Sequence, residues 1–193
     1  MQANIASHRI TEVEEAAMVA DSTTPVTVPG PGTYRIDPQR SKVSYTSRHM
    51  FGLGTVHAEF TITSAEIRVA EVPTASTVVA SLSAASFTSN SARRDRDVKS
   101  GGLLDVATYP EITFTSGAVR EVEGHPVVEG TVTAHGSTVD VEVTVLRAVN
   151  EADGLRVQAR AEHLDRYAFG ITGSKGMVGR YFDLDFDVLA VSA

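Results

Sequence analysis

The densest group of side chains that could do chemistry lies between positions 93 and 99. It places four cations around two carboxylates: Arg93, Arg94, Arg96, Lys99, Asp95 and Asp97. Guanidinium groups form paired hydrogen bonds with phosphate oxygens, so this cluster could hold a pyrophosphate or another anionic head group. It could equally be a solvated helix face, on which exposed Arg–Asp pairs contribute little. The solvated face is preferred for Arg93 and Arg96, and both interpretations stay open for Arg94.

Three other polar positions are candidates of the same kind. His49 could donate a hydrogen bond to a head group or to a quinone oxygen, or it could be an ordinary histidine at the edge of the structure. His135 precedes a glycine in a predicted turn, so a structural role is favoured. Asp165 and Arg166 fall in a predicted loop, where such a pair more often fixes the chain than does chemistry.

Several classes of active site are missing from the sequence. It has no Gly-x-Ser-x-Gly, no His-Glu-x-x-His and no phosphate-loop motif, and its six histidines lack metal-ligand spacing. It has no cysteine, which excludes disulfides and thiolate catalysis. The net charge of −7 argues against a nucleic-acid surface, which needs clustered cations. The sequence therefore predicts a protein that is not an enzyme and needs no cofactor.

The elements that must position these residues are strands. The clearest is 181–190, where apolar and charged residues alternate without a break. The apolar positions are Phe182, Leu184, Phe186 and Val188, and the charged ones are Asp183, Asp185 and Asp187. Alternate residues of a strand point to opposite faces, so this strand is expected to have one dry and one wet face.

The same alternation predicts about eight or nine strands in all. The other segments are 34–37, 43–49, 56–62, 78–84, 112–118, 128–134, 139–145 and 155–161. Turn residues at 123–126, 135–136 and 153–154 indicate hairpins. One segment breaks the pattern: 90–101 reads as a short helix, with Asn90 as its N-cap and Gly101-Gly102 as its stop.

Consecutive antiparallel strands with one apolar face must either stack as two sheets or close on themselves. We expect an all-β, antiparallel, lipocalin-like barrel of about eight strands, with the short helix across one end. The inward positions are rich in Ala, Val, Ser and Gly, and the whole chain has seven Phe, five Tyr and no Trp. Small residues on the inside of such a barrel leave room for one ligand.

Residues 1–32 differ from the barrel domain at 33–193. Thr11 and Glu14 could cap a short helix that ends near residue 20, and the Pro- and Gly-rich run at 22–32 reads as an extended linker. A disordered tail is the alternative. The first 22 residues show no apolar leader, so a cytoplasmic protein is expected, or a periplasmic or secreted one if a leader was removed.

Six blocks in order along the chain carry a family resemblance. They are Tyr34–Val43, His49–Phe60, Arg94–Asp105, Tyr109–Ser116 with Gly130–Gly136, and Asp165–Gly170. Over about residues 33–191 the sequence resembles the YceI-like family of polyisoprenoid-binding, lipocalin-like proteins. Two positions near the presumed mouth depart from the family pattern: Asp97 stands where relatives have His, and Leu103-Leu104 replaces an aromatic residue.

The resemblance implies an apolar interior that takes a long isoprenoid or fatty chain, a head group near one mouth, a homodimer, and no known catalysis. The ligand could be an isoprenoid lipid, a polyprenyl phosphate, a quinone or a fatty amide, held for transport, storage or sequestration. Transient contact with a membrane is also expected. Arg94 and Asp95 occupy the family's Arg-Asp positions, where tying the helix to the barrel rim is at least as good an explanation as ligand contact.

By the alternation, the expected lining residues are Val43, Tyr45, Val56, Phe60, Phe114, Val132, Val141, Phe182, Leu184 and Phe186. His49 and Arg94 are the polar candidates at the mouth, and Phe169 is the candidate plug. Two alternatives compete with ligand binding. One is an enzyme acting on a lipid head group through His49, Asp95 and Arg94. The other is a barrel filled by its own side chains that serves as a stress or interaction module.

Overall fold

The computed structural model describes residues 26–27, 29–49 and 53–193, and it describes His49 by its backbone alone. Nine strands dominate it: β1 (Gly32–Ile36), β2 (Lys42–His49), β3 (Gly54–Val69), β4 (Thr77–Ser89), β5 (Glu111–Val122), β6 (His125–Ala134), β7 (Ser137–Glu151), β8 (Gly154–Asp165) and β9 (Val178–Ser192). The short helix α1 (Ala92–Lys99) and one 3₁₀ turn (Pro73–Ala75) complete the secondary structure of the described residues.

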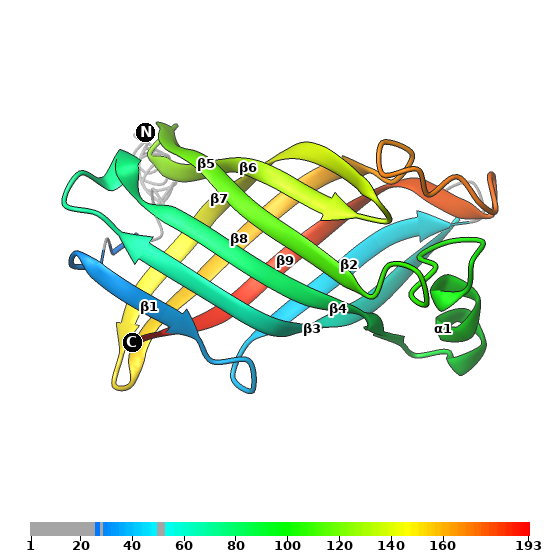
Figure 1. Ribbon diagram of the computed structural model, residues 1–193, viewed down its shortest axis with the longest axis horizontal. Helices are drawn as coiled ribbons and strands as arrows, with labels where there is room; N and C mark the ends of the chain where they lie inside the picture. The colour runs from blue at the N-terminus through cyan, green and yellow to red at the C-terminus, as the bar shows by residue number, and fades with distance from the viewer. Residues whose placement is uncertain (1–25, 28, 50–52) are drawn as a thin grey trace, which may run out of the picture.

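The strands close into an antiparallel barrel (Figure 1). The sheet order is β1-β3-β2-β9-β8-β7-β6-β5-β4, and β3 also pairs with β4, which joins the two ends. β1 and β2 share one place in the ring, since both pair with β3 and with β9, at different heights. The result is a ring of eight strand positions, which confirms the predicted barrel and its short helix.

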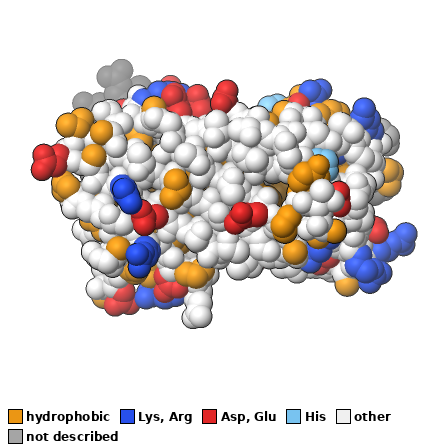
Figure 2. Space-filling model, in the orientation of Figure 1, with side chains coloured by type: hydrophobic (Ala, Val, Ile, Leu, Met, Phe, Trp, Pro, Cys, Tyr) orange, Lys and Arg blue, Asp and Glu red, His pale blue; other side chains and the backbone are white. Residues whose placement is uncertain are grey.

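The two faces of β9 show why the chain closes in this way. The aspartates point outward, where Asp185 accepts a 2.6 Å hydrogen bond from Arg160 and Asp187 a 3.1 Å bond from Gln158. Their apolar neighbours point into the barrel and contribute to its core clusters. The outer surface is accordingly mixed in charge on the face shown in Figure 2.

Two predicted hairpin turns are confirmed by their backbone angles. Glu123 and Gly124 have φ of 50° and 79°, and His135 and Gly136 have φ of 51° and 74°. Positive φ at both central residues is the twist that lets a two-residue loop join two antiparallel strands. These turns fix the register of β5 on β6 and of β6 on β7.

Two local predictions were wrong. The N-cap of α1 is Ser91, whose side chain accepts from the Arg94 N–H, and not Asn90. Ala118 does not share the inward face with Ser116, because the register of β5 on β6 shifts between them. The extra residue, Gly117, forms a β-bulge, which reverses the inward and outward positions of the residues that follow it in β5.

The interior has a packed cluster at each end of the barrel, defined here as the hairpin end and the helix end. The hairpin end holds the β7–β8 turn, β1 and the C-terminus, at the lower left of Figure 1. Its cluster comprises Ile36, Val43, Ile62, Ala148, Leu155 and Ala190. The helix end lies beside α1, and its cluster comprises Leu103, Ala134, Phe169 and Ile171.

The described part of the predicted linker lies against the barrel. Val26 forms a parallel bridge with Ala148, and the Thr27 N–H donates to the Ala148 carbonyl at 2.7 Å. β6 pairs with β7 only up to Thr144, so this contact uses a stretch of β7 that β6 has left unpaired. Val26 also packs on the hairpin-end cluster. The predicted helix at 11–20 lies outside the described residues.

Candidate ligand-binding site

Four aromatic rings meet inside the barrel, and three of them were expected there. Tyr45 stacks on Phe182 with ring centres 5.2 Å apart, and it meets Phe60 and Phe87 edge to face at 6.4 and 5.8 Å. Phe169, the predicted plug, lies 6.5 Å from Phe182 and is 2% exposed. Phe169 therefore sits in the packed helix end, which links the aromatic group to that cluster.

Other inward side chains keep part of their surface accessible to water. We call this set the open lining: Phe60, Leu184 and Phe186, which border the hairpin-end cluster, Val132, which borders the helix-end cluster, and Ala80 and Phe114, which belong to neither. At the hairpin end, by contrast, Val43 and Ala190 are 0% and 1% exposed. A side chain that points into a barrel and still has accessible surface must border space that protein atoms do not fill. Of the remaining predicted residues, Val56 is also partly exposed, and Val141 is buried.

Phe114 is held in the open lining by a glycine on the next strand. A Cβ added at Gly130 would lie 2.7 Å from the Phe114 ring, which is too close. The ring therefore lies directly against the bare Gly130 backbone, and any larger residue would push it away. Phe114 belongs to neither packed cluster among the described residues.

Arg166 is the charged group inside the helix end, and it is 3% exposed. Its guanidinium donates to the carbonyls of Ile171 at 2.5 Å, Gly179 at 2.8 Å and Val178 at 3.2 Å. Burial lowers its pKa, and burial likewise raises the pKa of Tyr45. Arg166 therefore closes the loop between β8 and β9 by binding the backbone in the middle of the loop and at the start of β9.

The predicted Asp165–Arg166 pair does not form. Asp165 accepts instead from Arg180, with the shortest contact at 2.7 Å, and these hydrogen bonds lower the pKa of the Asp165 carboxyl. Both residues still fix the same loop, as the sequence suggested, but through separate partners. His135 is also structural, because its ring packs on Tyr109 at 4.7 Å between centres.

Asp95, one of the two acids in the basic cluster, ties α1 to the barrel. Asp95 Oδ1 accepts from the Ser89 N–H at 3.0 Å and from the Ser89 hydroxyl at 2.6 Å, and the hydroxyl bond lowers the pKa of the Asp95 carboxyl. Ser89 ends β4, so this contact is the tie to the rim that the sequence offered as one alternative. Arg94 is half-buried, and within the described chain its guanidinium has no carboxylate partner. His49 is the last residue of β2, and its side chain lies outside the described residues.

One inward aromatic residue was missed. Phe87 falls on the wrong parity if the alternation of 78–84 is continued, but the register of β4 on β3 jumps from Thr61↔Ser83 to Glu59↔Thr88. The Ser86 hydroxyl, which donates to Ser83 and accepts from Thr61, holds this irregular stretch. A serine-rich interruption of the apolar pattern is the signal that could have revealed it.

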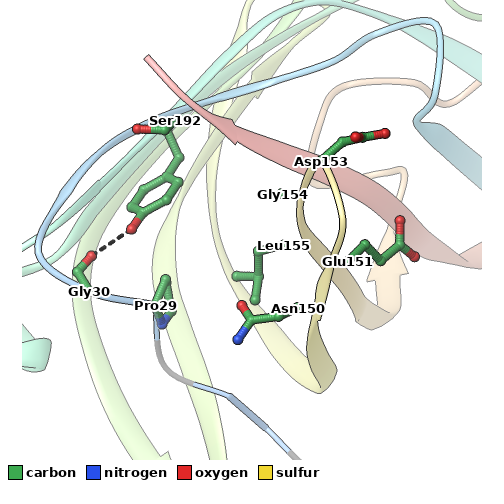
Figure 3. Close-up of a pocket in the computed structure, with 9 residues that line it drawn as sticks. Pro29, Gly30, Asn150, Glu151, Asp153, Gly154, Leu155 and Ser192 are labelled. Carbon is green, nitrogen blue, oxygen red and sulfur yellow. Dashed lines mark hydrogen bonds between the residues drawn. The ribbon is translucent and has the colours of Figure 1, made fainter.

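Two hollows open on the barrel surface. One of about 450 Å³ lies between the linker at Pro29-Gly30 and the β7–β8 hairpin at 150–155 (Figure 3). Its carboxylates are engaged, Asp153 with Arg40 at 2.9 Å and Glu151 with Arg156 at 3.2 Å. The other, of about 630 Å³, lies over β5, β6 and β7 beside the Gly117 bulge. Neither contains the predicted lining apart from Val141, which borders the second.

The described residues hold no group of three or more His, Asp or Glu side chains that could bind a metal ion. No described helix is both long and apolar enough to cross a bilayer.

The fold and its lining can now be set beside known proteins. The model of the YceI-like domain matches residues 34–190. The chain belongs to the YceI-like family. A UPF0312 protein of Pseudomonas putida strain GB-1 is 36% identical over 124 residues, and this match covers 62% of the chain and 64% of the relative.

Solved structures agree on the YceI-like fold. BcnA of Burkholderia cenocepacia matches with a TM-score of 0.72 at 23% identity, over 81% of this chain and 99% of BcnA. A polyisoprenoid binding domain from Saccharophagus degradans matches with a TM-score of 0.62 at 15% identity, over 83% and 98% of the two chains. At these identities the likeness concerns the fold, and it confirms the predicted lipocalin-like barrel.

Proposed function

We propose that this YceI-like barrel binds a long-chain apolar ligand along its open lining and holds it for transport, storage or sequestration. The observation that carries the proposal is the contrast inside the barrel. Apolar side chains with accessible surface, Phe114 above all, lie between two end clusters whose own residues are almost fully buried. The Saccharophagus degradans domain of the same fold is described as polyisoprenoid binding, which supports an isoprenoid as the ligand class.

Burial of hydrocarbon is sufficient to drive such binding. Each methylene removed from water contributes about 0.8 kcal/mol, so a chain of several isoprene units releases on the order of 20 kcal/mol before ordering costs. Those costs are large, and measured affinities seldom exceed about −18 kcal/mol. The tail can therefore supply the affinity, and polar groups at the mouth would set orientation and selectivity.

The chemistry of the interior supports binding in preference to catalysis. Two ionisable side chains lie inside the described barrel at this end: Tyr45 belongs to the predicted lining, and Arg166 is the buried charged residue. The Arg166 donors are engaged by three backbone carbonyls. Asp95, which the enzyme alternative needs as a working acid, is occupied by Ser89. A general acid or base must be free to reach a substrate proton, and neither group is.

The test is recovery of the ligand from the purified full chain. Native mass spectrometry and organic extraction should show a bound lipid in the wild type. Leu184→Asp places a carboxylate in the open lining and should abolish retention, while Arg96→Ala on the exposed face of α1 should retain it. Circular dichroism of each variant checks that the barrel is folded. Equal lipid content in the wild type and a folded Leu184→Asp variant would overturn the proposal.

A further inference from the structure

Two of the most exposed apolar side chains lie on the same rim, at the helix end of the barrel. Leu53 is 88% exposed just before β3, and Met177 is 59% exposed just before β9. The strands that follow them flank β2, since His49 pairs with Gly54 on one side and with Val178 on the other. Neighbouring strands lie about 4.8 Å apart, so the ends of β3 and β9 on either side of β2 are about 10 Å apart, and both tips lie on one rim.

Cations without carboxylate partners surround this rim. Arg48 lies at the end of β2 and Lys175 in the loop before β9, and α1 adds Arg93, Arg96 and Lys99. Within the described chain no acid forms an ion pair with any of the five. Figure 2 shows Lys and Arg side chains gathered at the end of the molecule where Figure 1 places α1.

Aromatic rings add to the same rim. Lys175 and Arg180 lie over the Tyr167 ring at 5.3 and 5.1 Å, and Arg180 also lies 5.1 Å from the centre of Tyr181, which is 40% exposed. Tyrosines beside Lys and Arg are typical of protein surfaces that sit at the level of lipid head groups, because one end of the ring is apolar and the other wet.

The opposite end of the barrel exposes apolar residues too, but in acidic surroundings. At the hairpin end, Val72 in the β3–β4 connection is 62% exposed, and Val122, the last residue of β5, is 37% exposed. Their neighbours Glu71, Glu121 and Glu123 are exposed, and no described cation pairs with them. The chain carries a net charge of −7, so the basic rim is a local concentration and not the general character of the surface.

We infer that the helix end docks on an anionic lipid bilayer, with Leu53 and Met177 inserted among the head groups and the surrounding cations over the lipid phosphates. Basic residues beside apolar tips bind such surfaces through combined electrostatic attraction and shallow burial. An acidic protein partner could form ion pairs with the cations, but this would not by itself explain why two apolar side chains are exposed to solvent beside them. The inference does not depend on whether the barrel holds a lipid, although docking at this end would bring a mouth of the barrel to the membrane.

The experiment is co-sedimentation of the full chain with vesicles. One set contains phosphatidylcholine alone and the other mixes it with phosphatidylglycerol. The wild type should bind the anionic vesicles, bind the neutral ones weakly, and lose binding as salt is raised. The double variant Leu53→Asp with Met177→Asp, and the pair Arg93→Glu with Arg96→Glu, should each weaken binding at least about tenfold.

The matched control is Val72→Asp with Val122→Asp, which makes the same chemical change at the acidic end and should leave binding unchanged. All the substituted residues are exposed, Val122 least at 37%, so each variant should unfold at the temperature of the wild type. No binding to anionic vesicles, equal binding to both vesicle types, or an equal loss in the control pair would overturn the inference. Failure here would leave lipid recovery from the barrel interior unaffected, so the two proposals fail separately.

Discussion

The packed ends of the barrel and the open lining between them are made by the same alternation of residues, yet they differ in how completely they fill. At the hairpin end, Ile36 of β1 and Val26 of the linker cover the inward side chains. At the helix end, Leu103 and Phe169 enter from loops. Within the open lining, Phe114 on β5 and Ala80 on β4 belong to neither cluster, although both point inward. Strand parity therefore decides which residues face inward, and β1, the linker and the loops decide where the inside is closely packed.

The largest expected difference between the two regions is in the removal of an aromatic ring. Phe169→Ala empties a filled site at the helix end and should cost about 3–5 kcal/mol of unfolding free energy. Phe114→Ala removes a ring that already borders open space, so it should cost clearly less, about half as much. Urea unfolding of both variants measures this. Equal costs would mean that the lining is as tightly packed as the ends.

The converse change adds a ring to each region. Ala190→Phe overfills the hairpin end, where Ala190 is 1% exposed, and should destabilise the fold by about 1–3 kcal/mol. Ala80→Phe should be accommodated with little change in stability and should lower the amount of lipid that is extracted, because the new ring occupies the ligand's space. Thermal unfolding and extraction check the pair. A strong destabilisation by Ala80→Phe would contradict an open lining.

The loss of buried donors at the helix end gives an effect of intermediate size. Arg166→Met leaves three backbone carbonyls without the guanidinium, and unsatisfied buried groups typically cost about 1–3 kcal/mol. Because the contacts close the loop between β8 and β9, amide exchange should accelerate there and remain slow at the hairpin end. Uniform acceleration would show that Arg166 does not act locally.

The smallest effect expected is a sensitivity of the helix end to acid. The pKa of Asp95 is lowered in the fold, chiefly by the Ser89 hydroxyl. Its contribution is therefore present above its unfolded pKa near 3.9 and is lost as the pH falls through the lower folded value. Solvent screening limits it to about 0.5 kcal/mol. Asp95→Asn should flatten the pH dependence of stability below pH 5, about one unit above that pKa.

The barrel could be predicted from the sequence because its signal is local. Strand parity at 181–190 and turn chemistry at His135-Gly136 each follow from neighbouring residues, and the structure confirms both. The interruptions could not be predicted in the same way. The Gly117 bulge turned Ala118 outward, and the irregular stretch around Ser86 turned Phe87 inward, because both depend on pairing with another strand.

The site shows the same division. The alternation correctly gave Tyr45, Phe60 and Phe182 as inward neighbours. The burial of Arg166 was not foreseen, because its partners are backbone carbonyls that carry no sequence signature. The cluster at α1 was read by residue type alone, and only the structure separates Asp95, which is a tie to β4, from the unpaired cations around it.

The central claim, an interior that takes an apolar chain, is tested most directly by locating a ligand against individual methyl groups. The protein would be labelled at Val, Leu and Ile methyls and mixed with an unlabelled isoprenoid alcohol, and intermolecular NOEs would be recorded. The account predicts contacts to Val132 and Leu184 in the open lining and none to Ile36 at the packed hairpin end. Contacts confined to outward methyls such as those of Val79 or Leu146, or no contacts at all, would contradict it.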